Sequence, residues 1–507
     1  MILDRALKPI AINLPSDSLY ASSRLIKNKE RVIRKLQEVL GLSYNYLKDR
    51  IYRNKAFVWI ARKLSLDQVN AIKKSNVEGV GFIRESKRCY PDGMLASHIV
   101  GFAGLDNAGL EGLELSFDEQ LKGTSGWAQV LRDARQNKLL WEKIFLPKDG
   151  YEVVLTIDEI IQFIAERELD RVYKTFHAKG ASIVVMDPNT GEILALANRP
   201  AYDLNNPQDA PLDTRRNRAI CDMFEPGSVF KIVTASAALE ENKFTESDRI
   251  FCENGTYRVA NHILHDHEPK GWLTFKEVIA ESSNIGTTKI AQKLGPNTVY
   301  KYAALFGFSK KTGVDMPGEI SGSLKDPRFW SKTSIGAVPI GQEVGVTALQ
   351  LAMAISVIAN GGVLMKPFVV KRLQDSQQEV IKEFLPQEVR RVISQKTARR
   401  VKDILVAVTE EGTGKQARVE DFKVAGKTGT AQKLEPNGAY SHRKFVASFI
   451  GFAPADKPLV AIAICVDEPH PYYYGGVVAA PVFKRVASDV VRYLLANAKP
   501  KEEAKIK

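Results

Sequence analysis

The first residues whose types and spacing suit covalent chemistry are Ser228 and Lys231, three positions apart. Pro226-Gly227 before them predicts a turn, and the residues after Lys231 favour a helix, so both side chains should share one helical face. A serine hydroxyl becomes a nucleophile when a base takes its proton, and a lysine amine can be that base where burial lowers its pKa. Free N–H groups at a helix N-terminus would favour a developing oxyanion. Alone, a serine and a lysine at this spacing are weak evidence, because a chain of this length is expected to contain such a pair by chance. The alternative is an ordinary helix start.

A second polar group is Ser282 with Asn284, which again precedes a helical stretch. A serine and an asparagine two positions apart can present a hydroxyl and an amide to one cleft, where they could relay a proton and hold a substrate amide. The alternative is a helix N-cap cluster, because serine and asparagine are favoured there. Taken alone, this pair favours the N-cap interpretation.

A third group is Lys427, Thr428, Gly429 and Thr430, which follows an apolar approach typical of a strand. Lys427 offers a positive charge, the two threonines offer hydroxyls to a carboxylate, and Gly429 lets another backbone come close. An extended peptide could add to such a strand by backbone pairing.

Gly426-Lys427-Thr428 also resembles the end of a phosphate-binding P-loop. That motif needs a glycine five residues before Gly426, and the chain has Asp421 there. A helix should also follow, whereas Gly429, Pro436 and Gly438 interrupt one. A nucleotide-binding loop is therefore not expected.

Two hairpins and two long helices are predicted around these groups. Strands over 181–186 and 193–197 form one hairpin, and strands over 445–452 and 459–466 form the other. Amphipathic helices are expected over 157–173 and 481–496. Strands at both ends of this region with helices between them indicate an α+β domain. Further candidates in the N-terminal region are a basic helical stretch over 23–40 and strands over 56–60 and 80–82.

The charge of the chain is concentrated at its N-terminus. The 507 residues carry a formal net charge of +13, and residues 1–89 alone hold 19 Lys and Arg against 8 Asp and Glu, a net +11. A hydrophobic content of 44% excludes a wholly disordered chain. No nucleic-acid motif accompanies the charge, so we expect contact with acidic lipid headgroups or a protein partner, and no nucleic acid.

The cysteines and the longest uncharged run point to no special chemistry. Four scattered cysteines without a Cys-x-x-Cys pair indicate packed free thiols, with no particular disulfide pairing favoured. His262, His265 and His267 could supply metal ligands, but nothing completes a site, so we expect no metal. The run 344–365 is long enough to span a bilayer, yet its polar residues and glycines favour a buried helix.

The order Ser-x-x-Lys, Ser-x-Asn, Lys-Thr-Gly, separated by 54 and 145 residues, resembles the penicillin-binding proteins. Two further stretches also resemble that family, and the resemblance covers nearly the whole chain. One is Gly109-Leu-Glu-Gly-Leu-Glu114, and the other is Gly341-Gln-Glu-Val-Gly-Val-Thr347 with its following helix. The long N-terminal region without a glycosyltransferase block resembles the class B, monofunctional branch, in its cell-division subtype.

The resemblance implies a β-lactamase-like transpeptidase domain over 150–497, with an antiparallel sheet flanked by helices. It also implies a pedestal or dimerisation-type domain over 1–149, and a charged tail follows at 498–507. Ser228 would be the acylated nucleophile and Lys231 its base, while Ser282 and Asn284 would relay a proton and orient the stem peptide. Lys427, Thr428, Gly429 and Thr430 would bind the substrate, with the backbone N–H groups of Ser228 and Thr430 as the oxyanion hole. No cofactor or metal is implied.

The reaction implied is cross-linking of peptidoglycan stem peptides, with a D-Ala-D-Ala donor and an amine acceptor. β-Lactams would bind covalently, and a glycosyltransferase and division proteins would be partners. The resemblance also implies the outer face of the cytoplasmic membrane, although the chain begins at the end of the stretch that normally follows the anchor. A late start codon or a trimmed form would explain this. Two alternatives stay open, namely a β-lactamase or D,D-carboxypeptidase and a non-catalytic penicillin sensor or scaffold.

Overall fold

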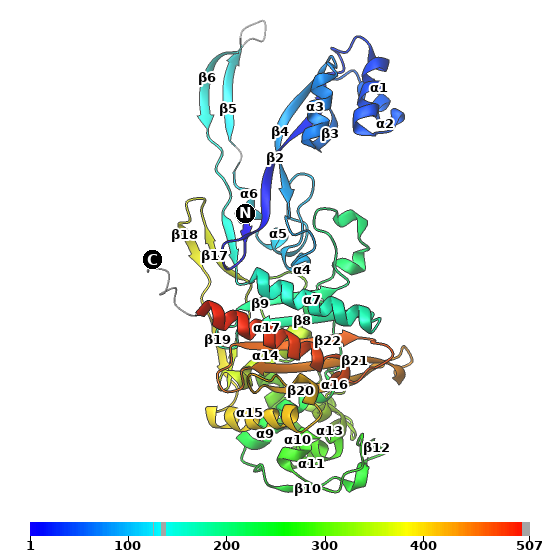
Figure 1. The fold of residues 1–507 in the computed structure, drawn as a ribbon, viewed down its shortest axis with the longest axis vertical. Helices are drawn as coiled ribbons and strands as arrows, with labels where there is room; N and C mark the ends of the chain where they lie inside the picture. Colours follow the sequence, from blue (N-terminus) through cyan, green and yellow to red (C-terminus); the bar gives the residue numbers. More distant parts are fainter. Residues whose placement is uncertain (125, 133–137, 499–507) are drawn as a thin grey trace. The chain divides into compact units, whose positions relative to one another are not determined.

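The computed structural model describes residues 1–124, 126–132 and 138–498, and within them the chain forms two compact units (Figure 1). The first unit contains residues 9–91 and 103–108. The second contains residues 2–8, 92–102 and the described residues from 109 onward. The charged tail predicted over 498–507 lies outside the described residues except for Ala498.

The first unit is a three-stranded antiparallel sheet covered by helices. Its strands are β2 (Pro9–Ala21), β3 (Val58–Leu64) and β4 (Val80–Cys89), with β2 paired to both others. Leu19, Ile33 and Leu36 contribute to its buried core. Its helices are α1 (Lys29–Leu40), α2 (Tyr44–Ile51) and α3 (Leu66–Lys74).

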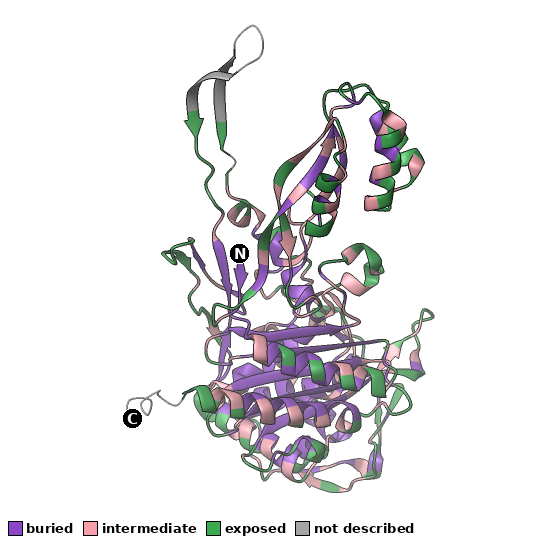
Figure 2. Ribbon diagram, turned by 45° about the horizontal axis from the view of Figure 1, so that its top comes forward, coloured by how far each residue is buried: buried purple, intermediate pink, exposed green. Residues whose placement is uncertain are grey.

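The second unit is built on a five-stranded antiparallel sheet in the order β20-β21-β22-β8-β9. Figure 2 shows these strands as almost continuously buried. Strands that are far apart in the sequence therefore combine in one sheet, as expected for an α+β domain. They are β8 (Gly180–Met186), β9 (Ile193–Arg199), β20 (Ala425–Leu434), β21 (Tyr440–Ala453) and β22 (Val460–Asp467).

Helices cover both faces of this sheet. On one face, α7 (Glu159–Thr175) and α17 (Ala480–Ala498) pack on side chains such as Ile183, Phe449 and Ile464. On the other face, α14 (Ala348–Ala359) packs against β8, β21 and β22. Every residue of α14 from Ala348 to Ile358 is buried, which confirms the prediction of a core helix in the long uncharged run.

The remaining helices and strands of the second unit surround the sheet. The helices are α4 (Ser97–Val100), α5 (Gly112–Ser116), α6 (Asp118–Lys122), α8 (Arg218–Cys221), α9 (Lys231–Glu240), α10 (Phe275–Ala280), α11 (Asn284–Leu294), α12 (Pro296–Leu305), α13 (Ser334–Ala337), α15 (Gln395–Glu410) and α16 (Gly475–Val478). The strands form a second sheet, β18-β17-β7-β1, and several two-stranded pairs. They are β1 (Ile2–Leu3), β5 (Trp127–Arg132), β6 (Lys138–Phe145), β7 (Glu152–Leu155), β10 (Arg249–Phe251), β11 (Thr256–Val259), β12 (His262–His265), β13 (Trp272–Thr274), β14 (Ser323–Leu324), β15 (Val344–Gly345), β16 (Val363–Met365), β17 (Val370–Gln374), β18 (Val380–Glu383) and β19 (Glu388–Arg391).

Most predicted elements agree with these bounds to within a few residues. The strand predicted over 80–82 continues to Cys89, the strand predicted over 445–452 already begins at Tyr440, and the first helix is shorter than predicted. The basic stretch predicted over 23–40 becomes helical only at Lys29, because Asn28 caps the helix by accepting a bond from the Arg31 N–H. Cys89, Cys221, Cys252 and Cys465 are free thiols, as expected. Among the described residues, no helix combines the length and the apolar character needed to cross a membrane.

Candidate active site

The fold brings the three sequence motifs into contact around the side chain of Ser282. The Lys231 Nζ atom donates to the Ser282 carbonyl at 2.5 Å and to Asn284 Oδ1 at 2.8 Å, and lies 3.2 Å from Ser282 Oγ. From the opposite side, Lys427 Nζ donates to Ser282 Oγ at 2.8 Å. Lys231 and Lys427, which come from different motifs, thus share the Ser282 hydroxyl.

Ser228 stands on a tight turn that leads directly into α9. A 3₁₀ turn over Gly227–Phe230 precedes the helix, and Gly227 has a positive φ of 57°. A Cβ atom on Gly341 would lie 2.1 Å from the Gly227 carbonyl, so this close packing requires glycine at 341. Ser228 is partly exposed, and within the described part of the chain its hydroxyl has no hydrogen-bond partner. The hydroxyl is therefore free to meet a substrate.

The second motif combines a helix cap with the polar cluster around Ser282. Ser283 caps α11 by accepting a bond from the Gly286 N–H at 2.9 Å. Ser282 adopts a positive φ of 61°, and it and Asn284 contact Lys231. The N-cap interpretation is therefore correct for Ser283, and the interpretation as a polar pair holds for its two neighbours.

Asp266 holds this motif in place, and the sequence analysis missed that role. Its carboxylate accepts bonds from Ser283 Oγ at 2.6 Å and from the backbone N–H groups of Asn284 at 2.6 Å and Ile285 at 3.1 Å. A carboxylate at a helix N-terminus is favoured by the helix dipole. Asp266 lies 18 positions before Asn284, so no local pattern in the sequence links them.

Burial controls the protonation of the two lysines. Lys231 and Lys427 are both 0% exposed. Burial lowers the pKa of Lys231 from 10.5 to about 7, and the Asp266 carboxylate opposes this only in part. Burial and the nearby charge of Lys231 lower the pKa of Lys427 well below its usual value. A neutral Lys231 has two N–H donors, which its two shortest contacts use, and one lone pair left to accept a proton.

The third motif lies on β20, beside the turn that carries Ser228. A Cβ atom on Gly429 would lie 2.9 Å from the Pro226 carbonyl, so glycine permits the close approach of the two segments. The hydroxyl of Thr430 accepts a bond from the Gly475 N–H at 3.0 Å, and Thr428 shares a hydrogen bond with Thr413 at 2.8 Å. The segment continues as a strand, which agrees with the rejection of a P-loop.

The histidine segment contributes its backbone to this region. The His265 carbonyl accepts a bond from Asn284 Nδ2 at 3.0 Å, and the ring of His267 lies 5.1 Å from that of Tyr474. In the described ranges, no group of three His, Cys, Asp or Glu side chains is arranged to hold a metal ion.

Sequence profiles of two protein families match the chain. The one described as "Penicillin binding protein transpeptidase domain" matches residues 181–488, and the one described as "Penicillin-binding Protein dimerisation domain" matches residues 1–155. The chain belongs to the class B penicillin-binding proteins. The transpeptidase profile spans all three sequence motifs, from Ser228 to Thr430.

Curated relatives of this class B penicillin-binding protein match along almost the full chain. The probable peptidoglycan D,D-transpeptidase PenA of Neisseria meningitidis is 35% identical over 100% of this chain and 86% of its own length. Stage V sporulation protein D of Bacillus subtilis is 36% identical over 96% of this chain and 77% of its own. Peptidoglycan D,D-transpeptidase FtsI of Escherichia coli is 31% identical over 97% of this chain and 83% of its own length.

Solved structures agree with the fold of this class B penicillin-binding protein. Penicillin-binding protein 3 of Mycobacterium tuberculosis in complex with aztreonam superposes with a TM-score of 0.76, at 28% identity over 98% of this chain and 96% of that chain. A peptidoglycan synthetase from Bifidobacterium adolescentis has a TM-score of 0.79 at 23% identity over 98% and 96% of the two chains.

Proposed function

We propose that this protein is a serine D,D-transpeptidase that cross-links peptidoglycan stem peptides through an acyl-enzyme on Ser228. The single observation that carries this proposal is the shared contact of Lys231, Ser282 and Lys427 beside the Ser228 turn. A buried amine with a pKa of about 7 can take a proton at neutral pH. Among the curated relatives, PenA and FtsI are named for this reaction.

In the acylation step, Ser228 Oγ attacks the carbonyl carbon of the D-Ala-D-Ala bond while Lys231 takes the hydroxyl proton. The oxyanion would be held by the backbone N–H groups of Ser228 and Thr430. The proton then passes through Ser282 to the leaving amine of the terminal D-Ala, and Asn284 holds the substrate amide. Lys427, Thr428 and Thr430 bind the terminal carboxylate, and Gly429 keeps the strand open to the peptide.

In the second step, an amine of another stem peptide attacks the acyl carbon. The C–O bond to Ser228 breaks, the amine loses a proton, and Ser228 regains one, so the enzyme returns to its starting state. Proton exchange between Lys231 and Ser282 serves both steps, because their heavy atoms lie 3.2 Å apart. The active site needs no cofactor for this acyl transfer.

The domain limits and the cellular setting complete the proposal. We assign the transpeptidase domain to 150–497 and the pedestal domain to 1–149, and the profile matches over residues 181–488 and 1–155 support a division of the chain into these two parts. The protein would act at the outer face of the cytoplasmic membrane in septal wall synthesis, as the relationship to FtsI suggests. A glycosyltransferase and division proteins would be its partners, and β-lactams would acylate Ser228, since a related structure contains aztreonam.

The test is labelling with a fluorescent penicillin, followed by peptide mapping. The wild type should form a long-lived adduct on Ser228, and Ser228→Ala should lose labelling completely with an unchanged melting temperature. Ser321→Ala, at an exposed loop serine, is the matched control and should label normally. Labelling that survives Ser228→Ala would overturn the assignment. Rapid release of hydrolysed drug would instead indicate a β-lactamase.

A further inference from the structure

The segment that leads into the turn carrying Ser228 is held by backbone hydrogen bonds on both sides of Glu225. Phe224 exchanges two such bonds with Val346, at 3.1 and 2.9 Å. On the other side of Glu225, the N–H group of the first residue of the turn donates to the Gly341 carbonyl at 3.0 Å. The Glu225 side chain therefore leaves the chain between two fixed points of the backbone.

The Glu225 carboxylate connects this segment with two others. Its Oε1 atom accepts hydrogen bonds from the Glu343 N–H at 2.9 Å and from the Tyr440 hydroxyl at 3.2 Å. Glu343 has a positive φ of 57°, which a residue other than glycine rarely adopts unless its surroundings hold it. Tyr440 begins β21 and pairs with Leu434 at the end of β20, the strand of the third motif. One oxygen atom thus joins three segments of the chain.

The Glu343 side chain extends this connection to α11, the helix that begins in the second motif. Its Oε2 atom accepts a bond from Ser334 Oγ at 2.7 Å, and Ser334 is the first residue of α13. The two helices α13 and α11 pack against each other, and the Thr288 hydroxyl of α11 donates to the Gly336 carbonyl of α13 at 3.3 Å. Glu225 is therefore connected with segments that carry all three motifs.

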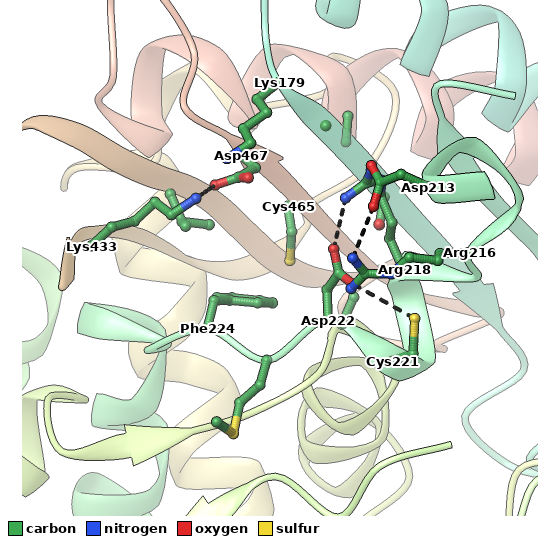
Figure 3. A pocket seen from close by; sticks show the side chains of 16 residues that line it. Lys179, Asp213, Arg216, Arg218, Cys221, Asp222, Phe224, Lys433, Cys465 and Asp467 are labelled. Atoms are coloured by element: carbon green, nitrogen blue, oxygen red, sulfur yellow. Dashed lines mark hydrogen bonds and ion pairs between the residues drawn. The ribbon is translucent and has the colours of Figure 1, made fainter. Parts of the chain in front are cut away.

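Two observations favour a functional role for Glu225 over a purely stabilising one. Phe224 lines a cavity of about 390 Å³ (Figure 3). Protein atoms do not fill this space, so packing contacts that would fix the segment are missing there, and the hydrogen bonds of Glu225 carry more of the positioning. Glu225 Oε2 is buried without a hydrogen-bond partner among the described residues, and burial raises the pKa of this carboxyl group. Such exceptions to polar satisfaction are expected at functional sites.

The two N–H groups of the proposed oxyanion hole come from different segments, Ser228 from the turn and Thr430 from β20. Their separation depends on how the turn lies on the strand. A Cβ atom on Gly227 would lie 3.2 Å from the Thr430 carbonyl oxygen, so the two segments are in close contact. The bond from Tyr440 to Glu225 links the approach to the turn with β21, which is hydrogen-bonded to β20. This link limits sliding of the turn along the strand.

We propose that Glu225 is a positioning residue, whose Oε1 atom keeps the turn in register with β20 and β21 so that the N–H groups of Ser228 and Thr430 converge on the oxyanion. This inference rests on the proposed acyl transfer at Ser228. Glu225 touches no substrate atom in this role. Because oxyanion-hole donors act mainly in the transition state, loss of their alignment slows acylation without weakening the binding of substrate.

Three variants separate this role from stability alone. Glu225→Ala removes the acceptor, Glu225→Gln keeps an acceptor oxygen for both donors, and Tyr440→Phe removes one donor without changing the charge. Glu241→Ala is the matched control, because Glu241 Oε1 likewise accepts a bond from a tyrosine hydroxyl, that of Tyr302 at 2.9 Å. Glu241 lies just beyond the C-terminal end of α9, about 15 Å along the helix from Lys231. The measurement is stopped-flow acylation by penicillin at a series of concentrations, which gives a limiting rate and a half-saturating concentration for each protein.

Glu225→Ala should lower the limiting rate by at least about tenfold, with the half-saturating concentration within about twofold of the wild type. Glu225→Gln should keep the limiting rate within about twofold, Tyr440→Phe should lower it by about threefold, and Glu241→Ala should acylate normally. An unchanged limiting rate in Glu225→Ala, or a change confined to the half-saturating concentration, would overturn the proposal, as would a glutamine variant as slow as the alanine variant. If Glu225→Ala does not fold, the limiting rate of Tyr440→Phe decides in the same way. Failure of the proposed function is distinct, because the wild type itself would then give no adduct on Ser228.

Discussion

Replacing Lys231 by methionine removes a titratable group from a fully buried position while keeping a flexible side chain of similar length. In the unfolded chain this lysine titrates near 10.5, whereas in the folded protein burial lowers its pKa to about 7. The folded state therefore binds fewer protons between these values, and wild-type stability must rise with pH across this interval.

The sign and size of the effect follow from this shift. The penalty for burying the lysine is absent above pH 10.5, grows as the pH falls, and is complete below about 7. At 1.36 kcal/mol per pKa unit, the complete penalty is about 5 kcal/mol. Between pH 9 and pH 7, wild-type stability should fall by about 2 kcal/mol relative to the variant. Relief of the repulsion on Lys427 acts in the same direction.

The assay is urea unfolding of wild type and Lys231→Met at pH 7 and pH 9, with the free energy of unfolding extrapolated to water. The variant leaves buried acceptors on Ser282 and Asn284 without a donor, a cost that does not change with pH. The test is therefore the change in the difference between the two proteins. Lys243→Met, at an exposed lysine, controls for loss of a charge. An equal difference at both pH values would refute a neutral Lys231.

Three further predictions concern the same structure. Acylation by penicillin should accelerate as the pH rises through about 7, because only neutral Lys231 accepts a proton; a flat stopped-flow profile from pH 5 to 8 would contradict this. Asp266→Asn should lower the free energy of unfolding by about 1–3 kcal/mol and slow acylation at least tenfold. Ser283→Ala should lower the free energy of unfolding by about 1 kcal/mol and keep the acylation rate within threefold of the wild type. Equal acylation rates in Asp266→Asn and Ser283→Ala would show that Asp266 does not position the motif. Replacing Arg24, Lys27, Arg31, Arg34 and Lys35 by glutamate should abolish sedimentation with anionic vesicles, because each basic residue contributes about 1 kcal/mol to binding an anionic surface. Unchanged sedimentation would mean that this charge serves solubility alone.

The hairpins and long helices were predictable because their patterns are local. The segments 181–186 and 193–197 are two apolar runs on either side of a turn, and the structure places β8 and β9 there. The three motifs could be assembled only through their order and the family resemblance, because their contacts span up to 145 positions. The role of the Asp266 carboxylate had no local signal, since its contacts depend on segments that the fold brings together.

The strand order of the main sheet has a consequence for the synthesis of the protein. Ser228 is in the first half of the chain, but β20 follows nearly two hundred residues later and joins β8 only through β21 and β22. A ribosome that has completed the turn carrying Ser228 must continue past Asp467 before the sheet can close. Chains released before that point would carry the serine without its second lysine held in place. Penicillin labelling of the nascent chain therefore reports completed synthesis of the catalytic sheet.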